Sequence, residues 1–252
     1  MATFKDYFSR QAAIYAQHRP AYPEALFTYL ASLSPAQDLA WDCGCGNGQS
    51  ALGLAAHFSS VYASDPSAEQ INHATAHSRI TYRIEPAEHC SLPDRSADLV
   101  TVAQALHWFR FEDFFAEVRR VLKPGGVLAV WIYGLPQLSP ELDRLIRHFH
   151  DDVVGAYWQY ENRLIENGYA DIAFPFEPLP TPAFSASRNL TREALSGLLY
   201  SWSAVQRFRE HEGYDPVAGI QEELTALWPQ AEAQRQAVWP LTLIAGIPGS
   251  RR

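Results

Sequence analysis

The chain has 252 residues, a length that favours one compact domain or one domain with an appendage. Hydrophobic residues make up 47% of it and charged residues 19%, which excludes a disordered or fibrous chain. The formal charge of −8 argues against a broadly basic surface for nucleic acid or anionic membranes, although it leaves room for a local basic pocket.

Three cysteines, Cys43, Cys45 and Cys90, are too few for a disulfide framework and favour a reducing cytoplasm. The first two would need two further ligands to bind zinc, and none stands at a suitable spacing, so we expect no metal site. No segment approaches the ~20 apolar residues of a membrane span, and the N-terminus lacks a secretory pattern. We therefore expect a soluble cytoplasmic protein.

The first forty residues are predicted to form helices separated by a bend. Aromatic and apolar side chains share one helical face up to Tyr15, and Pro20 and Pro23 then force an extended conformation. A second helical period runs over residues 24–32 and ends at Ser34. We expect residues 1–38 to be a helical cover for the unit that follows.

From residue 39 to residue 133, short apolar runs alternate with amphipathic stretches. A first strand precedes a glycine-rich turn, and further strands are predicted over residues 61–64, 80–84, 97–103 and 127–133. Helices are predicted over residues 49–58, 67–77 and 111–122, with Ser67 as an N-cap. Repeated strand and helix units with short links predict an α/β core with a doubly wound parallel sheet.

The alternation of short apolar runs with amphipathic stretches ends at Gly134. Residues 135–180 are rich in aromatic residues and prolines, and helical periods return over residues 191–208 and 216–227. The segment VWPLTLIAGI near the end predicts a final strand. We expect a core over 39–133, an inserted helical and aromatic cap with a sixth strand over 134–235, and a last strand and tail over 236–252. The cap would cover the C-terminal edge of the sheet.

Three glycines at alternate positions, Gly44, Gly46 and Gly48, separate the first predicted strand from the next helix. Glycine is favoured where φ is positive or where no Cβ fits, so this turn predicts a ligand lying directly against the backbone. In open parallel sheets such ligands bind outside the carboxyl ends of the strands, where the strand order reverses.

Two acidic residues indicate the chemistry of that ligand. Asp65 ends the second predicted strand about twenty residues beyond the turn, where a carboxylate accepts both hydroxyls of a ribose. The alternative is that Asp65 only caps the helix after Pro66. Asp42 directly precedes glycines spaced G-x-G-x-G, unlike the G-x-G-x-x-G of NAD and FAD sites. A carboxylate there would repel a pyrophosphate and favour an ammonium or sulfonium group, so we expect a positively charged nucleoside.

These motifs resemble the class I S-adenosylmethionine-dependent methyltransferases. The resemblance rests on residues 42–48, Asp65, Ala87-Glu88 and residues 117–126, and it covers most of residues 10–133. It implies a Rossmann-like fold with a mainly parallel seven-stranded sheet, S-adenosylmethionine as cofactor and S-adenosylhomocysteine as product. Residues 15–23, 105–109 and 201–206 are similar, more narrowly, to small-molecule methyltransferases related to trans-aconitate methyltransferase.

The resemblance implies roles for individual residues. The glycines and the region of Asp42 would hold the methionine part of the cofactor, Asp65 its ribose, and Ala87 and Glu88 its adenine. The carbonyl of Gln104 would face the methionine amine. Arg19 would pair with the methionine carboxylate, unless it is a surface residue fixed between prolines. The expected cofactor residues are Tyr15, Arg19, Asp42, Gly44, Cys45, Gly46, Asp65, Pro66, Gln70, Ala87, Glu88, Gln104 and Ala105.

Methyl transfer from a sulfonium is an in-line displacement whose leaving group is already activated. The protein mainly has to align and desolvate the nucleophile, so a dedicated catalytic residue is optional. The candidate is His107, which follows the fourth strand and could take a proton from a hydroxyl or amine as a neutral imidazole. The alternative is that His107 orients Trp108 or contacts the acceptor.

The expected acceptor site combines aromatic and polar residues, although such residues equally suit ordinary packing. They are His107, Trp108, Trp158, Tyr200, Trp202 and Gln206. A polyanionic acceptor would require Arg188 or Arg207 in this site, whereas the aromatic insertion equally suits a neutral hydrophobic metabolite. We expect a small-molecule acceptor methylated on oxygen or carboxyl rather than nitrogen, no nucleic-acid or membrane partner, and a monomer or weak homodimer.

Two other functions fit parts of the pattern. A cofactor-binding regulator without catalysis would share the cofactor residues and form no product. An NAD(P)-dependent oxidoreductase is opposed by the glycine spacing and by Asp42. A ligand that binds only the folded state raises stability, so thermal stabilisation by S-adenosylhomocysteine and not by NADH would separate the two enzyme classes.

Overall fold

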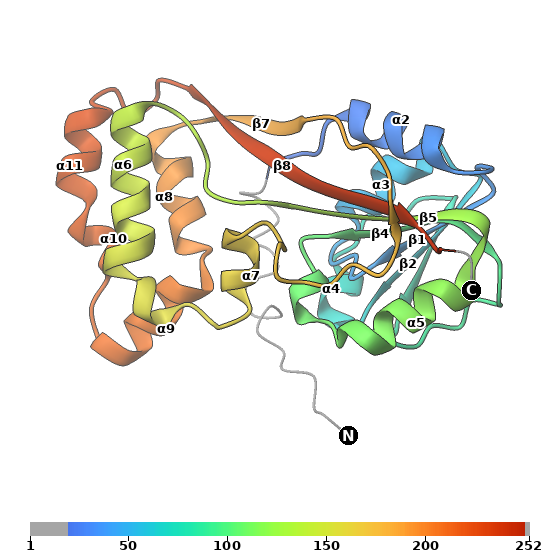
Figure 1. The fold of residues 1–252 in the computed structure, drawn as a ribbon. Coiled ribbons are helices and arrows are strands. Elements are labelled where there is room, and N and C mark those ends of the chain that lie inside the picture. Colours follow the sequence, from blue (N-terminus) through green and yellow to red (C-terminus); the bar gives the residue numbers. More distant parts are fainter. Residues whose placement is uncertain (1–19, 250–252) are drawn as a thin grey trace.

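The computed structural model describes residues 20–249. Its strands form one sheet in the order β3-β2-β1-β4-β5-β8-β6, and β7 also pairs with β8. Neighbours among β1 to β5 are parallel, and β8 runs antiparallel to β5. Helices α2 and α3 lie over one face of the sheet and α5 over the other (Figure 1). The predicted doubly wound α/β fold is confirmed.

The strands of the described chain are β1 (Leu39–Cys43), β2 (Ser60–Asp65), β3 (Ile80–Ile84), β4 (Ala97–Ala103), β5 (Leu122–Tyr133), β6 (Glu177–Pro178), β7 (Phe184–Leu190) and β8 (Arg235–Ile247). The α-helices are α2 (Glu24–Leu33), α3 (Gln49–Ala55), α4 (Ala68–Asn72), α5 (Phe111–Val121), α6 (Pro140–His148), α7 (Asn162–Glu166), α8 (Arg192–Tyr200), α9 (Ser203–Glu212), α10 (Pro216–Gly219) and α11 (Gln221–Leu227). Two 3₁₀ turns, η2 (Leu106–Trp108) and η4 (Gly155–Tyr157), and one π turn, η3 (Phe149–Val153), complete the elements of residues 20–249.

The sheet holds eight strands within the described residues, where seven were expected. The additional strand, β6, has two residues, which pair with Ile247 and Gly246 at the end of β8. Strand β8 is 13 residues long, and β7 pairs with its first half from Arg235 to Leu241. One long final strand therefore has room for two partners along the same edge.

Strand β4 lies at the centre of the sheet and shows why the core forms here. All its residues except Ala103 are buried, as a continuous apolar run predicts for a parallel strand covered on both faces. Leu99 packs in the cluster beneath α2 and α3, while Val100 and Val102 pack in the cluster beneath α5. This alternation anchors the strand, so that the turn after Ala103 has a fixed position.

Several predicted helices are shorter or divided. The helix expected over 67–77 ends at Asn72, because the chain then turns towards β3 and the Thr75 carbonyl accepts a hydrogen bond from Tyr82 Oη at 2.9 Å. The helix expected over 191–208 is broken near Ser201, whose hydroxyl donates to the Leu198 carbonyl at 2.6 Å, and Trp202 is extended. Helix α6 was not predicted, although Ser139 caps it and Pro140 occupies its first turn.

Helices α6 and α8 to α11 gather at one end of the sheet, and β8 runs from them into the core (Figure 1). The loop between β5 and α6 joins the sheet to these helices (Figure 1). None of the helices in residues 20–249 is long and apolar enough to cross a bilayer. The helical period predicted before residue 20, with Tyr15 and Arg19, lies outside the described residues.

Candidate active site

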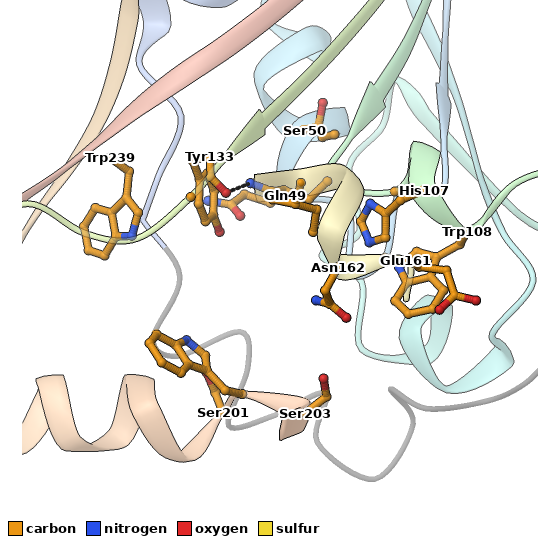
Figure 2. A pocket seen from close by; sticks show the side chains of 18 of the residues that line it. Gln49, Ser50, His107, Trp108, Tyr133, Glu161, Asn162, Ser201, Ser203 and Trp239 are labelled. Carbon is orange, nitrogen blue, oxygen red and sulfur yellow. Dashed lines mark hydrogen bonds between the residues drawn. The ribbon is translucent and has the colours of Figure 1, made fainter. Parts of the chain in front are cut away.

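A cavity of about 1250 Å³ lies between the carboxyl ends of the parallel strands and the helices that follow β5. Residues after β1, β2, β3 and β4 form one part of its wall. The other part comes from α6, η3, α7, the junction of α8 with α9, and β8. Figure 2 shows side chains from both parts around the same space.

The glycine turn forms the wall after β1, and its glycines have positive φ angles of 68°, 53° and 85° at Gly44, Gly46 and Gly48. A Cβ on Gly44 would lie 2.7 Å from the Ala105 Cβ, so this position also needs glycine for packing. A Cβ on Gly46 would meet only Gln70 Oε1, at 3.7 Å. The backbone at Gly46 is therefore open to close approach from the cavity, which fits a nucleoside lying on the turn.

Asp65 joins this turn to the end of β2. Its Oδ2 accepts from the Gly46 N–H at 2.9 Å, and its Oδ1 accepts from the Ser67 N–H at 2.9 Å. Ser67 itself caps α4 by accepting from the Gln70 N–H, as predicted. Asp65 thus fixes the turn and also lines the cavity.

Asp42 does not line the cavity, contrary to the expectation that its region contacts the cofactor. Its side chain is fully buried, and Thr101 Oγ1 donates to its Oδ1 at 2.9 Å. Burial raises the pKa of Asp42 to about 7, a rise that the hydrogen bond from Thr101 limits. Asp42 therefore supports the turn from within the sheet layer instead of touching a ligand.

The wall after β3 contains Ala87 and Glu88. The Glu88 Oε1 accepts from the Arg110 N–H at 2.8 Å, directly before α5 begins. Ala87 is buried, and both residues line the cavity. The carboxylate of Glu88 thereby links the end of β3 to the start of α5.

Gln104 turns the chain at the end of β4. Its φ is +58°, a conformation that residues other than glycine seldom adopt. Its N–H donates to the Trp131 carbonyl at 2.9 Å, and its Nε2 donates to the Tyr133 carbonyl at 3.4 Å. These bonds to β5 hold the unusual turn, which brings Ala105 and η2 into the cavity wall.

His107 on η2 is hydrogen-bonded to Tyr169, with 2.7 Å between Nδ1 and Oη. Both side chains are buried, and burial raises the pKa of Tyr169 well above its ordinary range, so the phenol keeps its proton. Within residues 20–249, the acceptor within hydrogen-bond distance of this phenolic proton is Nδ1 of His107. A buried hydroxyl proton left without an acceptor costs about 1–3 kcal/mol, which favours Tyr169 as the donor and Nδ1 of His107 as the acceptor.

Comparisons with known proteins agree with this geometry. The family described as methyltransferase domain matches residues 41–130, which hold the glycine turn, Asp65 and Glu88. A Dictyostelium discoideum protein that bears a methyltransferase name is 31% identical over 239 residues, covering 93% of this chain and 91% of its own. The chain belongs to the class I S-adenosylmethionine-dependent methyltransferases.

A solved structure assigned as a type II methyltransferase from Anaeromyxobacter dehalogenans is 41% identical to this methyltransferase. It superposes with a TM-score of 0.86 and covers 92% of this chain and 99% of its own. A methyltransferase from Aspergillus candidus is 29% identical over 200 residues, which are 68% of this chain and 62% of its own. The cofactor is therefore S-adenosylmethionine, and the oxidoreductase alternative does not hold.

The structure places most of the expected site residues of this methyltransferase in the cavity wall. Those that line it are Gly44, Cys45, Gly46, Asp65, Pro66, Gln70, Ala87, Glu88, Gln104, Ala105, His107, Trp108, Trp158 and Trp202. Tyr200 and Gln206 do not line it: Tyr200 Oη donates to Asp215 Oδ2 at 2.5 Å, and Gln206 Nε2 donates to the Tyr200 carbonyl at 2.9 Å. Because the predicted continuous helix breaks near Ser201, its residues do not share one face.

Neither candidate for binding a polyanion reaches the cavity wall. Arg188 lies on β7, and Arg207 Nη1 donates to the Tyr157 carbonyl at 3.4 Å. The wall instead contains residues that the sequence analysis missed, among them Tyr133, His150, Glu161, Asn162 and Trp239. Tyr133 ends the predicted fifth strand, so its position could have been inferred. Nothing in the spacing of Glu161 and Asn162 signals a site, because they lie at the start of a helix that was not predicted.

Proposed function

We propose that this methyltransferase acts on a small molecule and methylates a hydroxyl oxygen of it in preference to nitrogen. The acceptor would bind in the part of the cavity lined by residues from 143–166, 198–203 and 239–242, here called the acceptor chamber. Figure 2 shows Glu161 and Asn162 beside His107 and Trp108, with Trp239 and Tyr133 on the other side. The space is a cavity rather than a broad open face, which suits a small molecule better than a polymer.

The charge of the acceptor chamber carries the proposal. Among the described residues its wall holds four carboxylates, those of Asp143, Asp151, Glu161 and Glu166, and one guanidinium, that of Arg147. Such a wall repels a polyanion and attracts a neutral or positively charged compound, since clefts lined by one sign of charge focus their field. A relative of trans-aconitate methyltransferase with a polyanionic substrate would need more positively than negatively charged side chains in this wall.

The aromatic side chains of the acceptor chamber indicate that the acceptor itself contains a ring. Trp158 and Trp202 are in contact, with ring centroids 5.7 Å apart, and Trp239 lines the wall from β8. Indole faces pack against flat apolar rings and also attract cations. We therefore propose an aromatic hydroxyl compound, neutral or carrying an ammonium group. The same negative wall disfavours a carboxylate as the methylated group.

In the cofactor half, Gly44 and Gly46 would carry the methionine part, Asp65 the ribose, and Ala87 with Glu88 the adenine. When bound there, S-adenosylmethionine supplies an electrophilic methyl group on a sulfonium. The methyl group would pass to the acceptor oxygen, the electrons of the broken carbon–sulfur bond would stay on sulfur, and the hydroxyl proton would need an acceptor. The protein contributes alignment and exclusion of water.

His107 has a different role in this proposal from the one first expected. The short contact between Nδ1 and the Tyr169 phenol suits a His107 that accepts at Nδ1 and donates at Nε2, an arrangement that favours positioning over proton abstraction. We propose that it helps to position the acceptor or Trp108, whose ring centroid lies 4.8 Å from its own.

Three phenols with the same ring test the proposed acceptor. Tyramine carries an ammonium group, tyrosol a neutral alcohol and 3-(4-hydroxyphenyl)propionate a carboxylate, and each is incubated with S-adenosylmethionine. We expect mass spectrometry to detect methylated tyramine or tyrosol, with the higher kcat/KM for tyramine, and none or least of the methylated propionate. Preferred methylation of the propionate would overturn the proposal. Binding of S-adenosylhomocysteine without turnover of any acceptor, in this panel or in a metabolite extract, would instead indicate a silent regulator.

A further inference from the structure

Among residues 20–249, two histidines line the cavity, and their hydrogen-bond partners differ in a way that decides their chemistry. The Nδ1 of His107 faces the phenol of Tyr169, whereas the Nδ1 of His150 lies 2.6 Å from Oδ1 of Asp151. An ionised carboxylate can only accept hydrogen bonds, so the Nδ1 of His150 must carry the proton. Neutral His150 therefore keeps a lone pair on Nε2, which is the tautomer of a base.

The backbone around His150 is built in an unusual way. The residue lies in the π turn η3, which continues directly from α6. A π turn widens the helix by one residue and changes the direction of its side chains, and such turns are frequent at functional sites. Here the turn contributes both His150 and Asp151 to the cavity wall.

Two tryptophans fix the imidazole ring. Its centroid lies 4.7 Å from that of Trp158 and 5.5 Å from that of Trp202, with an interplanar angle of 85° to the second. Trp158 Nε1 also donates to the carbonyl of His150 at 3.1 Å. The side chain of His150 is only 13% exposed, although it lines the cavity. Ring packing, the backbone bond and Asp151 together leave it little freedom.

We propose that His150 is the general base of this methyltransferase and that Asp151 is its positioning residue. This inference rests on the proposed methylation of a hydroxyl group. As the oxygen–carbon bond forms and the carbon–sulfur bond breaks, the hydroxyl proton passes to Nε2 of His150. The imidazolium that results is stabilised by the Asp151 carboxylate and later returns the proton to water.

The charges around His150 are compatible with this cycle. Asp143 and Arg147 line the chamber from α6, Glu166 lines it from α7, and Glu161 lines it directly before α7. From α9, Arg207 donates to the Tyr157 carbonyl on the adjoining turn. Carboxylates outnumber guanidinium groups in this set, so the field favours the positive charge that His150 acquires during the step.

The chain contains a matched control. Nδ1 of His148 lies 2.7 Å from Oδ2 of Asp152, in the same kind of pair, but its side chain is 59% exposed and does not line the cavity. A substitution at His148 therefore removes a histidine paired with aspartate, from the same stretch of chain, without touching the proposed base.

The first test measures the tautomer directly. The full chain, labelled with ¹⁵N-histidine and saturated with S-adenosylhomocysteine, is studied by multiple-bond NMR correlation, and His150→Gln assigns the signal. We expect the Nδ1–H tautomer for neutral His150, and a shift towards Nε2–H in Asp151→Asn, because the asparagine amide can also donate. Nε2–H in the wild-type protein would overturn the proposal whether or not an acceptor has been found.

The second test is kinetic and uses whichever phenol is methylated. We expect kcat to fall at least about 100-fold in His150→Gln and about tenfold in Asp151→Asn. His148→Gln should stay within about twofold, and the affinity for S-adenosylhomocysteine should be unchanged in all three. The pH profile of kcat should differ between the wild-type protein and His150→Gln, because the variant lacks the proposed base. If His150→Gln keeps the wild-type kcat and pH profile, His150 is not the base. If the wild-type protein does not bind S-adenosylhomocysteine, this result would count against the proposed function itself.

Discussion

Oη of Tyr169 lies 2.7 Å from Nδ1 of His107, across 62 positions of the chain. Tyr169 has a φ of +64° and follows Gly168, whose φ is +68°, so two successive left-handed residues bring the phenol to this point. A bulky residue in that region costs about 1–3 kcal/mol, which surrounding contacts must offset. The hydrogen bond ties the segment after α7 to the turn after β4 and fixes the orientation of His107.

Removing the hydroxyl in Tyr169→Phe should lower the free energy of unfolding by about 1–3 kcal/mol, because Nδ1 of His107 is then buried without its donor. Urea unfolding measures this change. Tyr160→Phe is the control, since Tyr160 is 72% exposed and its hydroxyl should contribute less than about 0.5 kcal/mol. Equal stability of the two variants would show that the bond between His107 and Tyr169 contributes little.

Alanine at Gly48 should destabilise the cofactor turn. The φ of Gly48 is +85°, and a Cβ there would lie 2.2 Å from Tyr82 Oη, which is itself held by its bond to the Thr75 carbonyl. We expect Gly48→Ala to lower the free energy of unfolding by about 1–3 kcal/mol and to weaken binding of S-adenosylhomocysteine. Isothermal titration calorimetry measures the second effect.

Gly219→Ala is the matched control for that experiment. Gly219 lies on α10, has no positive φ, and a Cβ there would meet no atom within 4 Å. Alanine should therefore leave stability unchanged or raise it by up to about 1 kcal/mol, with the same cofactor affinity. A Gly48→Ala protein that matches it in both measurements would contradict the requirement for glycine in the turn.

Asp42 should make stability depend on pH. Its folded-state pKa of about 7 lies above the ordinary value of 3.8, so the folded protein binds the proton more tightly than the unfolded chain. Stability from this group is thus lost as pH rises between these two values, and the loss is complete above the higher one. The shift corresponds to at most about 4 kcal/mol.

Asp42→Asn removes this titration while Thr101 Oγ1 can still donate to the remaining oxygen. The free energy of unfolding of the variant should therefore rise relative to wild type between about pH 5 and pH 8. Urea unfolding across this range gives the difference at each pH. A difference that stays constant would mean that Asp42 does not titrate there.

The cofactor half could be predicted from the sequence because its signals are local. The run Ala97–Ala103 was predicted with its observed bounds, since an apolar strand between a turn and a polar end has few alternatives. The positive φ values at Gly44, Gly46 and Gly48 follow from the spacing of the glycines. The side chain of Asp42 was the exception. Its position in the sequence does not show that this side chain is fully buried and accepts a hydrogen bond from Thr101.

The site residues of the segment 134–235 could not be predicted from the sequence, because tertiary packing brings them together. Tyr200 and Gln206 were assigned to one helical face, but the backbone breaks between them, where the Ser201 hydroxyl bonds to the Leu198 carbonyl. His150 lies in a π turn, which has no periodic signature, and Tyr169 depends on a left-handed backbone at a residue that is not glycine. Of Tyr200, Gln206, His150 and Tyr169, only His150 lines the cavity, and its place there depends on the fold.

The negative acceptor chamber makes an electrostatic prediction in which two substitutions have opposite effects. Glu161 and Arg147 both line the chamber, and within residues 20–249 neither side chain has a salt-bridge partner. With S-adenosylhomocysteine bound, Glu161→Gln should raise the Kd of tyramine about fivefold, and Arg147→Gln should lower it by up to a similar factor. The Kd of neutral tyrosol should change less than twofold in both variants, and added salt should reduce the effects on tyramine by screening. Calorimetry with the two ligands measures all four values. If Glu161→Gln weakens tyrosol as much as tyramine, the carboxylate acts through packing or a neutral hydrogen bond, and the preference for a cation loses its support.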